Sequence, residues 1–163
     1  MDNSVHKYPS GHQVIPATLD HVEHIATHMR YHDVLEVEAH NFTPHAALEC
    51  ALRLDIETYT ILDHNDVPYG MFGCGSGHEG FYIWMLGTDD VKKYRRIFIK
   101  HSRAWVWGFV GIYEKVYNYV HTENKLAMRW LRWCGAEFEE PILINDQPFS
   151  KFTINKENVC VYS

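Results

Sequence analysis

The chain lacks the features that mark several large classes of protein. Among its 163 residues it has only four cysteines, and none of them forms a C-x-x-C pair. The first ten residues lack the basic and then apolar order of a signal peptide. No apolar run approaches the roughly 20 residues that cross a membrane, because the longest, residues 105–113, is flanked by charges. We therefore expect a soluble protein in a reducing cytoplasm, without a membrane partner, and reduced thiols at Cys50, Cys74, Cys134 and Cys160.

Positive charge is also scarce. The net charge of −6 argues against a broad nucleic-acid or anionic-membrane surface, so we expect no nucleic-acid partner. Twelve histidines raise the question of a metal, and His21, His24 and His28 share one face of a predicted helix. However, the chain has no H-E-x-x-H motif and no cysteine pair. We expect these histidines to form an outer helix face and predict no metal site.

The hydrophobic pattern predicts alternating strands and helices. Residues 1–12 are polar and predicted to be a flexible N-terminus, followed by a single domain over residues 13–163. We expect an irregular acidic connection between the first two helices and a tight hairpin turn at residues 64–66. The predicted helices are residues 22–29, 44–52, 91–113 and 124–134. The predicted strands are residues 13–18, 57–62, 67–74, 80–86, 116–121, 139–144 and 149–154.

The most informative stretch is residues 116–138. A β-branched and aromatic run is followed by Thr122 or Asn124, either of which can cap a helix, and Gly135 is suited to end that helix. Arg129 and Arg132 are predicted to face solvent. The predicted core face consists of Leu126, Ala127, Trp130, Leu131 and Cys134, which recur at three- and four-residue steps.

This segment resembles the closing part of the GNAT superfamily of acyl-CoA N-acyltransferases, since Asn124, Ala127 and Trp130 fall on that pattern. A closer resemblance is to a small GNAT-like family encoded by short-tailed phages, which includes the internal virion protein A type. That resemblance is carried by residues 84–88, 98–103 and 118–135 and extends over roughly residues 10–155. It implies an α/β (α+β) fold: a central mixed, mostly antiparallel, splayed sheet flanked by about four helices.

The resemblance also implies a place for acetyl-CoA. The pantetheine arm would lie at the end of the fourth strand, and the pyrophosphate at the start of the next helix. Residues 89–96 depart from the family because they contain no glycine, but four cations stand there instead. These cations could hold the pyrophosphate or form a solvated basic face paired with Asp89 and Asp90. The implied cofactor residues are Leu86, Gly87, Thr88, Lys92, Lys93, Arg95, Arg96 and Asn124, the last of which is equally suited to capping the helix.

The family tyrosine that protonates the leaving thiolate falls here on Leu131, which cannot donate a proton. Tyr119, His121 or Tyr117 could replace it, although each is also a plausible strand aromatic or a hydrogen-bonded histidine. Glu79 or His78 could act as general base, or could simply form a polar turn. The cysteines have no histidine at motif spacing, so we expect direct attack by the amine without a covalent cysteine intermediate.

Two functional classes remain open from the sequence. In the first, the protein is a phage-encoded acetyl-CoA-dependent N-acetyltransferase whose acceptor is a small amine, or a lysine or N-terminus of a host protein. In the second, the fold has lost its chemistry and serves as a virion, assembly or host-binding protein. Either would place the protein in the host cytoplasm during infection or in the virion. The oligomeric state is open, with a homodimer as one arrangement.

Overall fold

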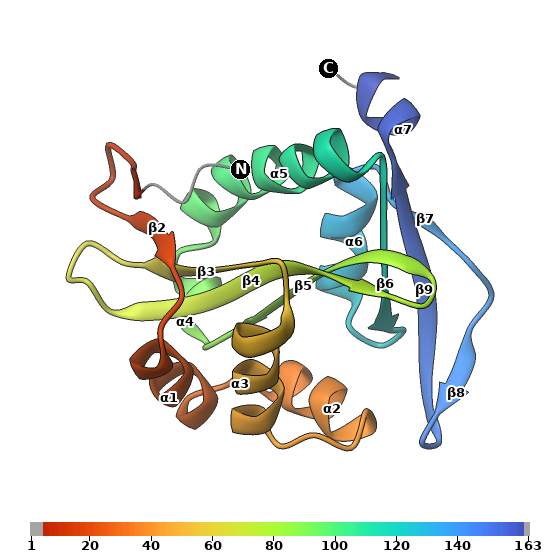
Figure 1. Cartoon of the computed structure of the whole chain (residues 1–163), viewed down its shortest axis with the longest axis horizontal. Coiled ribbons are helices and arrows are strands. Elements are labelled where there is room, and N and C mark those ends of the chain that lie inside the picture. The colour runs from red at the N-terminus through yellow and green to blue at the C-terminus, as the bar shows by residue number, and fades with distance from the viewer. Residues whose placement is uncertain (1–4, 162–163) are drawn as a thin grey trace. The chain divides into compact units, whose positions relative to one another are not determined.

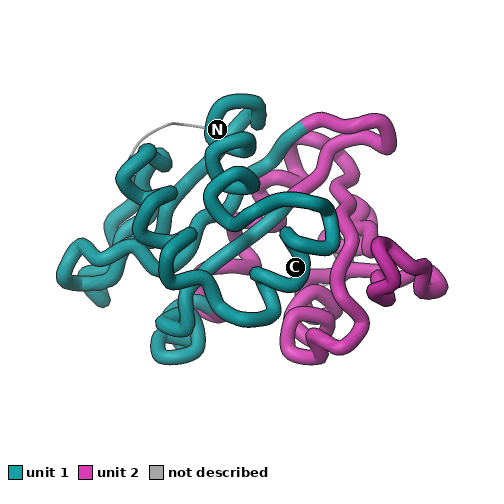
Figure 2. Tube along the Cα trace, turned by 90° about the horizontal axis from the view of Figure 1, so that it is seen from below, with its two compact units in different colours: residues 1–75, 84–98 teal, residues 76–83, 99–163 magenta. Residues whose placement is uncertain are grey.

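The computed structural model describes residues 5–161, with side chains to residue 159. These residues form seven helices and a mostly antiparallel sheet of nine strands (Figure 1). The strand order is β1-β2-β3-β4-β5-β6-β9-β7, and β8 pairs with β9. The predicted mixed α/β fold is confirmed. The chain divides into two compact units, which are described in turn (Figure 2).

Unit 1 contains the described residues up to Gly75 and Trp84–Phe98. Thr18 begins its first helix with a reciprocal cap, since its hydroxyl accepts from His21 N–H and the His21 ring accepts from Thr18 N–H. Thr43 caps the third helix, followed by Pro44 as the first helical residue. The elements are β1 (His6–Lys7), β2 (Gln13–Pro16), α1 (Leu19–Thr27), α2 (Tyr31–Ala39), α3 (Pro44–Leu54), β3 (Glu57–Leu62), most of β4 (Pro68–Gly77), the second half of β5 (Gly80–Gly87), α4 (Asp90–Lys93) and the start of α5 (Arg95–Tyr113).

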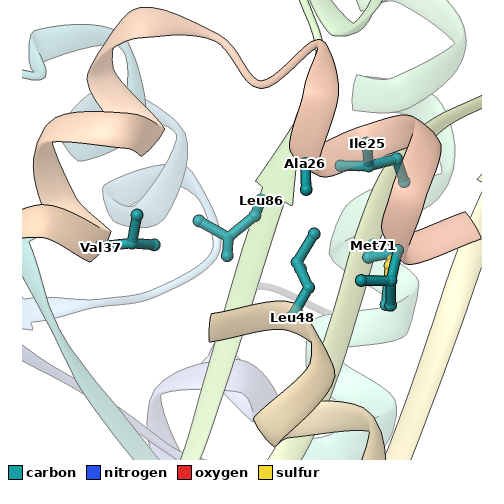
Figure 3. Packing of buried hydrophobic residues seen from close by; sticks show 7 residues of the cluster. Ile25, Ala26, Val37, Leu48, Met71 and Leu86 are labelled. Atoms are coloured by element: carbon teal, nitrogen blue, oxygen red, sulfur yellow. The ribbon is translucent and has the colours of Figure 1, made fainter. Parts of the chain in front are cut away.

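The core of unit 1 lies where α1, α2 and α3 pack on the sheet (Figure 3). Leu48 of α3 is fully buried and lies between Leu86 of β5 and Met71 of β4. This burial supplies most of the driving force that holds the three helices on the strands. The cluster is completed by Val22, Ile25, Ala26 and Val37.

The helices and strands depart from the predicted elements at several places. The connection predicted to be irregular contains α2, whose apolar spacing is masked because its buried face includes Asp33. The single helix predicted over residues 91–113 is two helices, since Tyr94 ends α4 and donates its hydroxyl to Asp63 Oδ2 at 3.2 Å. Within the segment predicted to be flexible, β1 pairs with β2. A further helix, α7 (Lys156–Val161), was not predicted.

Unit 2 contains Ser76–Ile83 and the described residues from Ile99 onward. Its central pair is β6 with β9, aligned antiparallel from Lys115↔Asn155 to His121↔Phe149. The first residues of β5 run parallel to β6, with Phe81 opposite Val116 and Tyr82 opposite Tyr117. The remaining elements are most of α5, β6 (Lys115–His121), α6 (Lys125–Trp133), β7 (Glu137–Phe138), β8 (Ile142–Ile144), β9 (Gln147–Asn155) and α7.

Helix α6 follows the predicted strand, helix, glycine and strand order. Asn124 caps it, and Gly135 beyond its end has a φ of 102°, the left-handed conformation that glycine adopts freely. Leu131 and Cys134 are buried and Arg129 and Arg132 are exposed, as predicted. Trp130 and Ala127 are half-buried.

The predicted core position of Leu126 is wrong. Its side chain is 70% exposed, and Met128 is buried in its place. At 100° per residue, Leu126 points about 140° away from Leu131, so that both cannot face the same core.

Replacing Leu131 with alanine should lower the free energy of unfolding by about 2–4 kcal/mol, because the removed atoms leave a cavity in a core that cannot fully relax. Leu131 is only 4% exposed. Urea denaturation of the variant and of Leu126→Ala, its exposed counterpart on the same helix, measures the difference. A loss at Leu126 equal to that at Leu131 would contradict the observed orientation of α6.

None of the helices among residues 5–161 is long and apolar enough to cross a membrane.

Candidate active site

In unit 2, the Glu79 carboxylate contacts two polar side chains from other elements, those of Tyr119 and Lys151. Glu79 lies with His78 in the turn between β4 and β5. The Tyr119 hydroxyl donates to Glu79 Oε1 at 2.9 Å and to Oε2 at 3.0 Å. Lys151 Nζ donates to Glu79 Oε1 at 2.9 Å. One carboxylate therefore holds a phenol and an ammonium at the same time.

The sheet explains why Tyr119 and Lys151 meet. Tyr119 of β6 lies directly opposite Lys151 of β9 in the antiparallel register. Directly opposed residues project from the same face of a sheet with their Cβ atoms about 4.5–5.5 Å apart. Both side chains therefore reach the same point, and the turn places the Glu79 carboxylate there.

The charges of these groups support one another. The hydrogen bond from Lys151 is the main influence that lowers the pKa of Glu79, followed by the bond from Tyr119. The same bond to Glu79 raises the pKa of Lys151. Removal from water is the main influence that raises the pKa of Tyr119, and its hydrogen bond to Glu79 adds to this. At neutral pH the site thus contains a carboxylate, an ammonium and a protonated phenol.

A second tyrosine completes the cluster. The Lys151 ammonium lies 5.1 Å from the centre of the Tyr117 ring, close enough for a cation–π contact. A Cβ atom on Gly77 would come within 2.9 Å of the Tyr117 hydroxyl, so glycine leaves the space that this tyrosine occupies. Desolvation is the main influence that raises the pKa of Tyr117. The hydroxyls of Tyr117 and Tyr119 are therefore both protonated at neutral pH.

The cluster borders a surface pocket of about 140 Å³. We call it the Glu79 pocket. Its walls carry three carboxylates and one ammonium, a balance that favours a cationic guest over an anionic one. It is lined by Glu79, Tyr119, Glu139, Glu140, Ile142 and Lys151.

The other predicted catalytic residues lie apart from this contact. His78 is exposed beside Glu79 in the turn. His121 is only 3% exposed, its Nε2 is 2.8 Å from Gln147 Oε1, and its Nδ1 accepts from Glu123 N–H at 3.2 Å. Both ring nitrogens are thus engaged in the local fold. The arrangement favours Tyr119 over His121 as a proton donor.

Leu86, Gly87 and Thr88, which were predicted to bind the cofactor, lie in unit 1. Much of their backbone is already hydrogen-bonded within the protein. Gly87 N–H donates to Asp33 Oδ2 at 2.8 Å, and Gly87 C=O accepts from Arg30 N–H at 2.9 Å. Thr88 N–H donates to Tyr69 C=O at 3.0 Å. These groups therefore serve the fold, and Leu86 is buried in the core cluster.

The four predicted cations, in contrast, are exposed. Lys92 and Lys93 lie on α4, and Arg95 and Arg96 form the first turn of α5. Cations at a helix N-terminus face the positive end of the helix dipole, so a bound anion would relieve that repulsion. Asn124 is placed as a cap, since its Oδ1 accepts from Ala127 N–H at 3.3 Å.

Sequence reasoning missed Lys151, Glu139 and Glu140. Lys151 is 72 residues from Glu79 in the sequence, and no motif connects the two. Lys151 is the one charged residue in the strand at residues 147–155, and this was the available signal for it.

No protein-family model matches the chain, and no curated protein matches its sequence. Solved structures do match its fold. A chimera of the Vibrio cholerae spermidine N-acetyltransferase is 13% identical with a TM-score of 0.66, over 93% of this chain and 99% of that chain. A Bacillus anthracis acetyltransferase of the GNAT family is 12% identical with a TM-score of 0.66, over 94% of this chain and 99% of that chain.

A GCN5-related N-acetyltransferase from Brucella melitensis is 11% identical with a TM-score of 0.63, over 97% of this chain and 81% of that chain. At these identities the likeness concerns the fold alone. The chain has the fold of the GNAT acetyltransferases, as the sequence resemblance implied. The relation to the phage-encoded family stays a prediction.

Proposed function

We propose that the protein is an acetyl-CoA-dependent N-acetyltransferase whose acceptor is a cationic amine. The observation that carries this proposal is the contact of Tyr119, Glu79 and Lys151 at the rim of the Glu79 pocket. The pocket's carboxylates would attract an ammonium group, and Tyr119 would supply a proton where the family tyrosine is replaced by Leu131. The spermidine acetyltransferase with this fold supports an acceptor of this charge.

The proposed reaction divides the proton transfers between two groups. The neutral amine attacks the thioester carbonyl, so that a C–N bond forms, and the C–S bond then breaks. Tyr119 donates its proton to the departing thiolate. Glu79 is engaged by two donors and has a lowered pKa, which makes it an anchor for the ammonium more than a base. His78 in the same turn is then the candidate to receive the proton of the amine, since imidazole is the side chain most often used for such transfer near neutral pH.

The direct test is calorimetry with acetyl-CoA, followed by a thiol-release assay with spermidine, a lysine peptide and a peptide with a free N-terminus. Release of CoA with spermidine in preference to an uncharged acceptor supports the proposal. Acetyl-CoA that does not bind at millimolar concentration overturns it and leaves the binding-protein function.

The phage resemblance adds a finer proposal about the acceptor. A lysine or N-terminus of a host protein carries the same positive charge as a polyamine and would meet the same carboxylates. Acetylation of the peptides with no turnover of spermidine would favour such an acceptor, in the host cytoplasm or delivered with the virion.

Changing Lys92 and Lys93 together to alanine should weaken acetyl-CoA binding by about tenfold, because two of the four cations on α4 and the first turn of α5 would no longer attract the phosphates. Calorimetry at low and high salt measures the effect, and the wild-type affinity should fall with salt. Lys115→Ala with Lys125→Ala removes the same charge from exposed positions of unit 2 and is the control. Equal losses in both double variants would mean that only net charge matters.

Replacing all four cysteines with alanine should leave turnover intact in a folded variant. Cys74 and Cys134 are buried, and desolvation raises the pKa of each thiol to about 12, so both stay protonated and unreactive at neutral pH. Cys50 is half-buried, and the Cys160 side chain lies outside the described residues. Loss of turnover with acetyl-CoA binding retained would indicate a cysteine-bound acyl intermediate instead.

A further inference from the structure

Lys151 places its own ammonium group in the Glu79 pocket. Its Nζ donates to Glu79 Oε1 at 2.9 Å and lies 5.1 Å from the centre of the Tyr117 ring. The side chain is 24% exposed, whereas that of Lys156, which pairs with Glu114 in the same unit at 3.3 Å, is 48% exposed. Lysines usually keep the ammonium in water, so the position of the Lys151 ammonium is set by the pocket.

The contacts of Lys151 are those by which a protein binds a foreign ammonium group. A carboxylate attracts the positive charge, and the face of a tyrosine ring adds a cation–π attraction. Lys151 carries the headgroup of an alkylamine on a flexible alkyl stem, so a ligand with the same headgroup meets a carboxylate that is already bound. One carboxylate neutralises only one ammonium, and a second ammonium beside Lys151 would be repelled. Such a ligand therefore has to compete with Lys151 for Glu79.

The sheet holds the backbone of Lys151 but leaves its side chain able to move. Lys151 lies opposite Tyr119 at one edge of β9, and its C=O accepts from Glu139 N–H at 2.9 Å at the other edge. The side chain can leave Glu79 by rotating about its own single bonds, which leaves the strand pairing intact.

The pocket also contains a second place for a positive charge. Glu139 and Glu140 line it together with Glu79. After the hydrogen bond to Glu79, the negative charge of Glu139 is among the influences that raise the pKa of Lys151. These carboxylates can therefore receive the displaced Lys151 ammonium or a further ammonium of the ligand.

We propose that Lys151 is a specificity-determining residue whose ammonium competes with an ammonium of the acceptor for Glu79. The inference rests on the proposed function, in which Glu79 anchors an ammonium while a neutral amine attacks the thioester. An acceptor with a single nitrogen cannot supply both, because the nitrogen that attacks has lost its charge. An acceptor with a second nitrogen keeps an ammonium that displaces Lys151. The competition therefore selects diamines and polyamines over monoamines.

The test compares diaminobutane with butylamine, which has the same carbon chain and one amino group fewer. Replacing Lys151 with methionine removes the competing charge and keeps a long unbranched side chain. In Lys151→Met the ratio of kcat/KM for diaminobutane to kcat/KM for butylamine should be at least about threefold higher than in the wild type. This ratio cancels any change in the chemical step that the two amines share. Calorimetry without acetyl-CoA should show a dissociation constant for diaminobutane at least about threefold lower in the variant.

Two control variants separate the charge of Lys151 from its size and from the net charge of the protein. Lys151→Arg keeps the competing charge, so both its kcat/KM ratio and its affinity for diaminobutane should stay at or below the wild-type values. Lys156→Met removes the exposed ammonium that pairs with Glu114 and should change neither quantity.

A further measurement uses the wild type alone. Nitrogen nuclear magnetic resonance of the lysine side chains should show the Lys151 Nζ signal shifting as diaminobutane saturates the protein, because the ammonium leaves Glu79. The Lys156 Nζ signal should stay in place.

A folded Lys151→Met whose kcat/KM ratio and diaminobutane affinity are unchanged or lower overturns the competition, because Lys151 then supports the pocket instead of occupying it. If that variant does not fold, the wild-type resonance decides, and a Lys151 Nζ signal that diaminobutane leaves in place overturns the proposal. If the wild type acetylates no amine, the proposed function fails separately. The affinities without acetyl-CoA and the resonance then still test the competition, and diaminobutane that binds neither protein overturns it.

Discussion

Replacing Tyr119 with phenylalanine is expected to lower kcat by about 10²- to 10⁴-fold, the range that a positioned general acid contributes. The ring would stay in place and only the hydroxyl that donates to Glu79 would be lost. Because the change concerns proton transfer to the leaving thiolate, the acetyl-CoA dissociation constant should stay within about twofold of the wild-type value. Initial rates of thiol release and calorimetry on the same preparation measure both quantities.

Tyr117→Phe is the matched control. It removes a hydroxyl from the neighbouring tyrosine on the same face of β6, whose ring contacts Lys151, but no proton donation is assigned to it. Its loss of kcat should be much smaller. If the two variants lose activity equally, the tyrosines act together as a hydrogen-bonded pair, and if neither does, the proton comes from elsewhere.

Local signals predicted the parts of the fold that depend on neighbours in sequence. The cap at Asn124 and the glycine at position 135 bracket α6 because each acts on backbone groups within one turn. The face of α6 was predicted less well, since Leu126 and Met128 are both apolar and only the packing decides which of them is buried.

The candidate site shows the same limit. Glu79 and Tyr119 were both predicted from their residue types, but the register that brings Tyr119 opposite Lys151 cannot be read from one strand alone. Gly87 was predicted to bind the cofactor, and here distant residues contradict a local signal. Its position at the end of β5 suggested backbone groups available to a ligand, whereas Asp33 and Arg30, more than fifty residues earlier, already hydrogen-bond to them.

Asp33 explains why α2 was missed and leads to the largest expected loss of stability. Its carboxylate is 2% exposed, accepts from Arg30 Nε at 2.6 Å and accepts from Gly87 N–H at 2.8 Å. It thereby fastens the start of α2 to the end of β5 within unit 1. A buried acid in a short helix breaks the apolar spacing that identifies helices in a sequence.

Replacing Asp33 with alanine should lower the free energy of unfolding by about 3–5 kcal/mol, because it leaves the buried Gly87 N–H and the Arg30 guanidinium without their acceptor. Urea denaturation measures the loss. Glu49→Ala breaks the exposed pair of Glu49 with Arg53 on α3 and should cost less than about 1 kcal/mol. Similar losses of unfolding free energy in the two variants would mean that the contacts of Asp33 stabilise the protein no more than an exposed ion pair does.

The pH dependence of stability separates the charge of Asp33 from its hydrogen bonds. Burial is the main influence that raises the pKa of Asp33 above its ordinary 3.8, and Arg30 and Gly87 offset only part of that rise. As the pH increases past 3.8, the unfolded chain therefore loses this proton before the folded protein does. Protonated Asp33 therefore makes its full contribution to stability below pH 3.8. That contribution is lost as the pH rises through the higher pKa that Asp33 has in the folded protein. Asp33→Asn keeps an acceptor for Gly87 but cannot ionise, so its unfolding free energy should lack this decline. Parallel stability curves for the wild type and Asp33→Asn from pH 3 to 7 would show that Asp33 ionises as freely in the folded protein as in the unfolded chain.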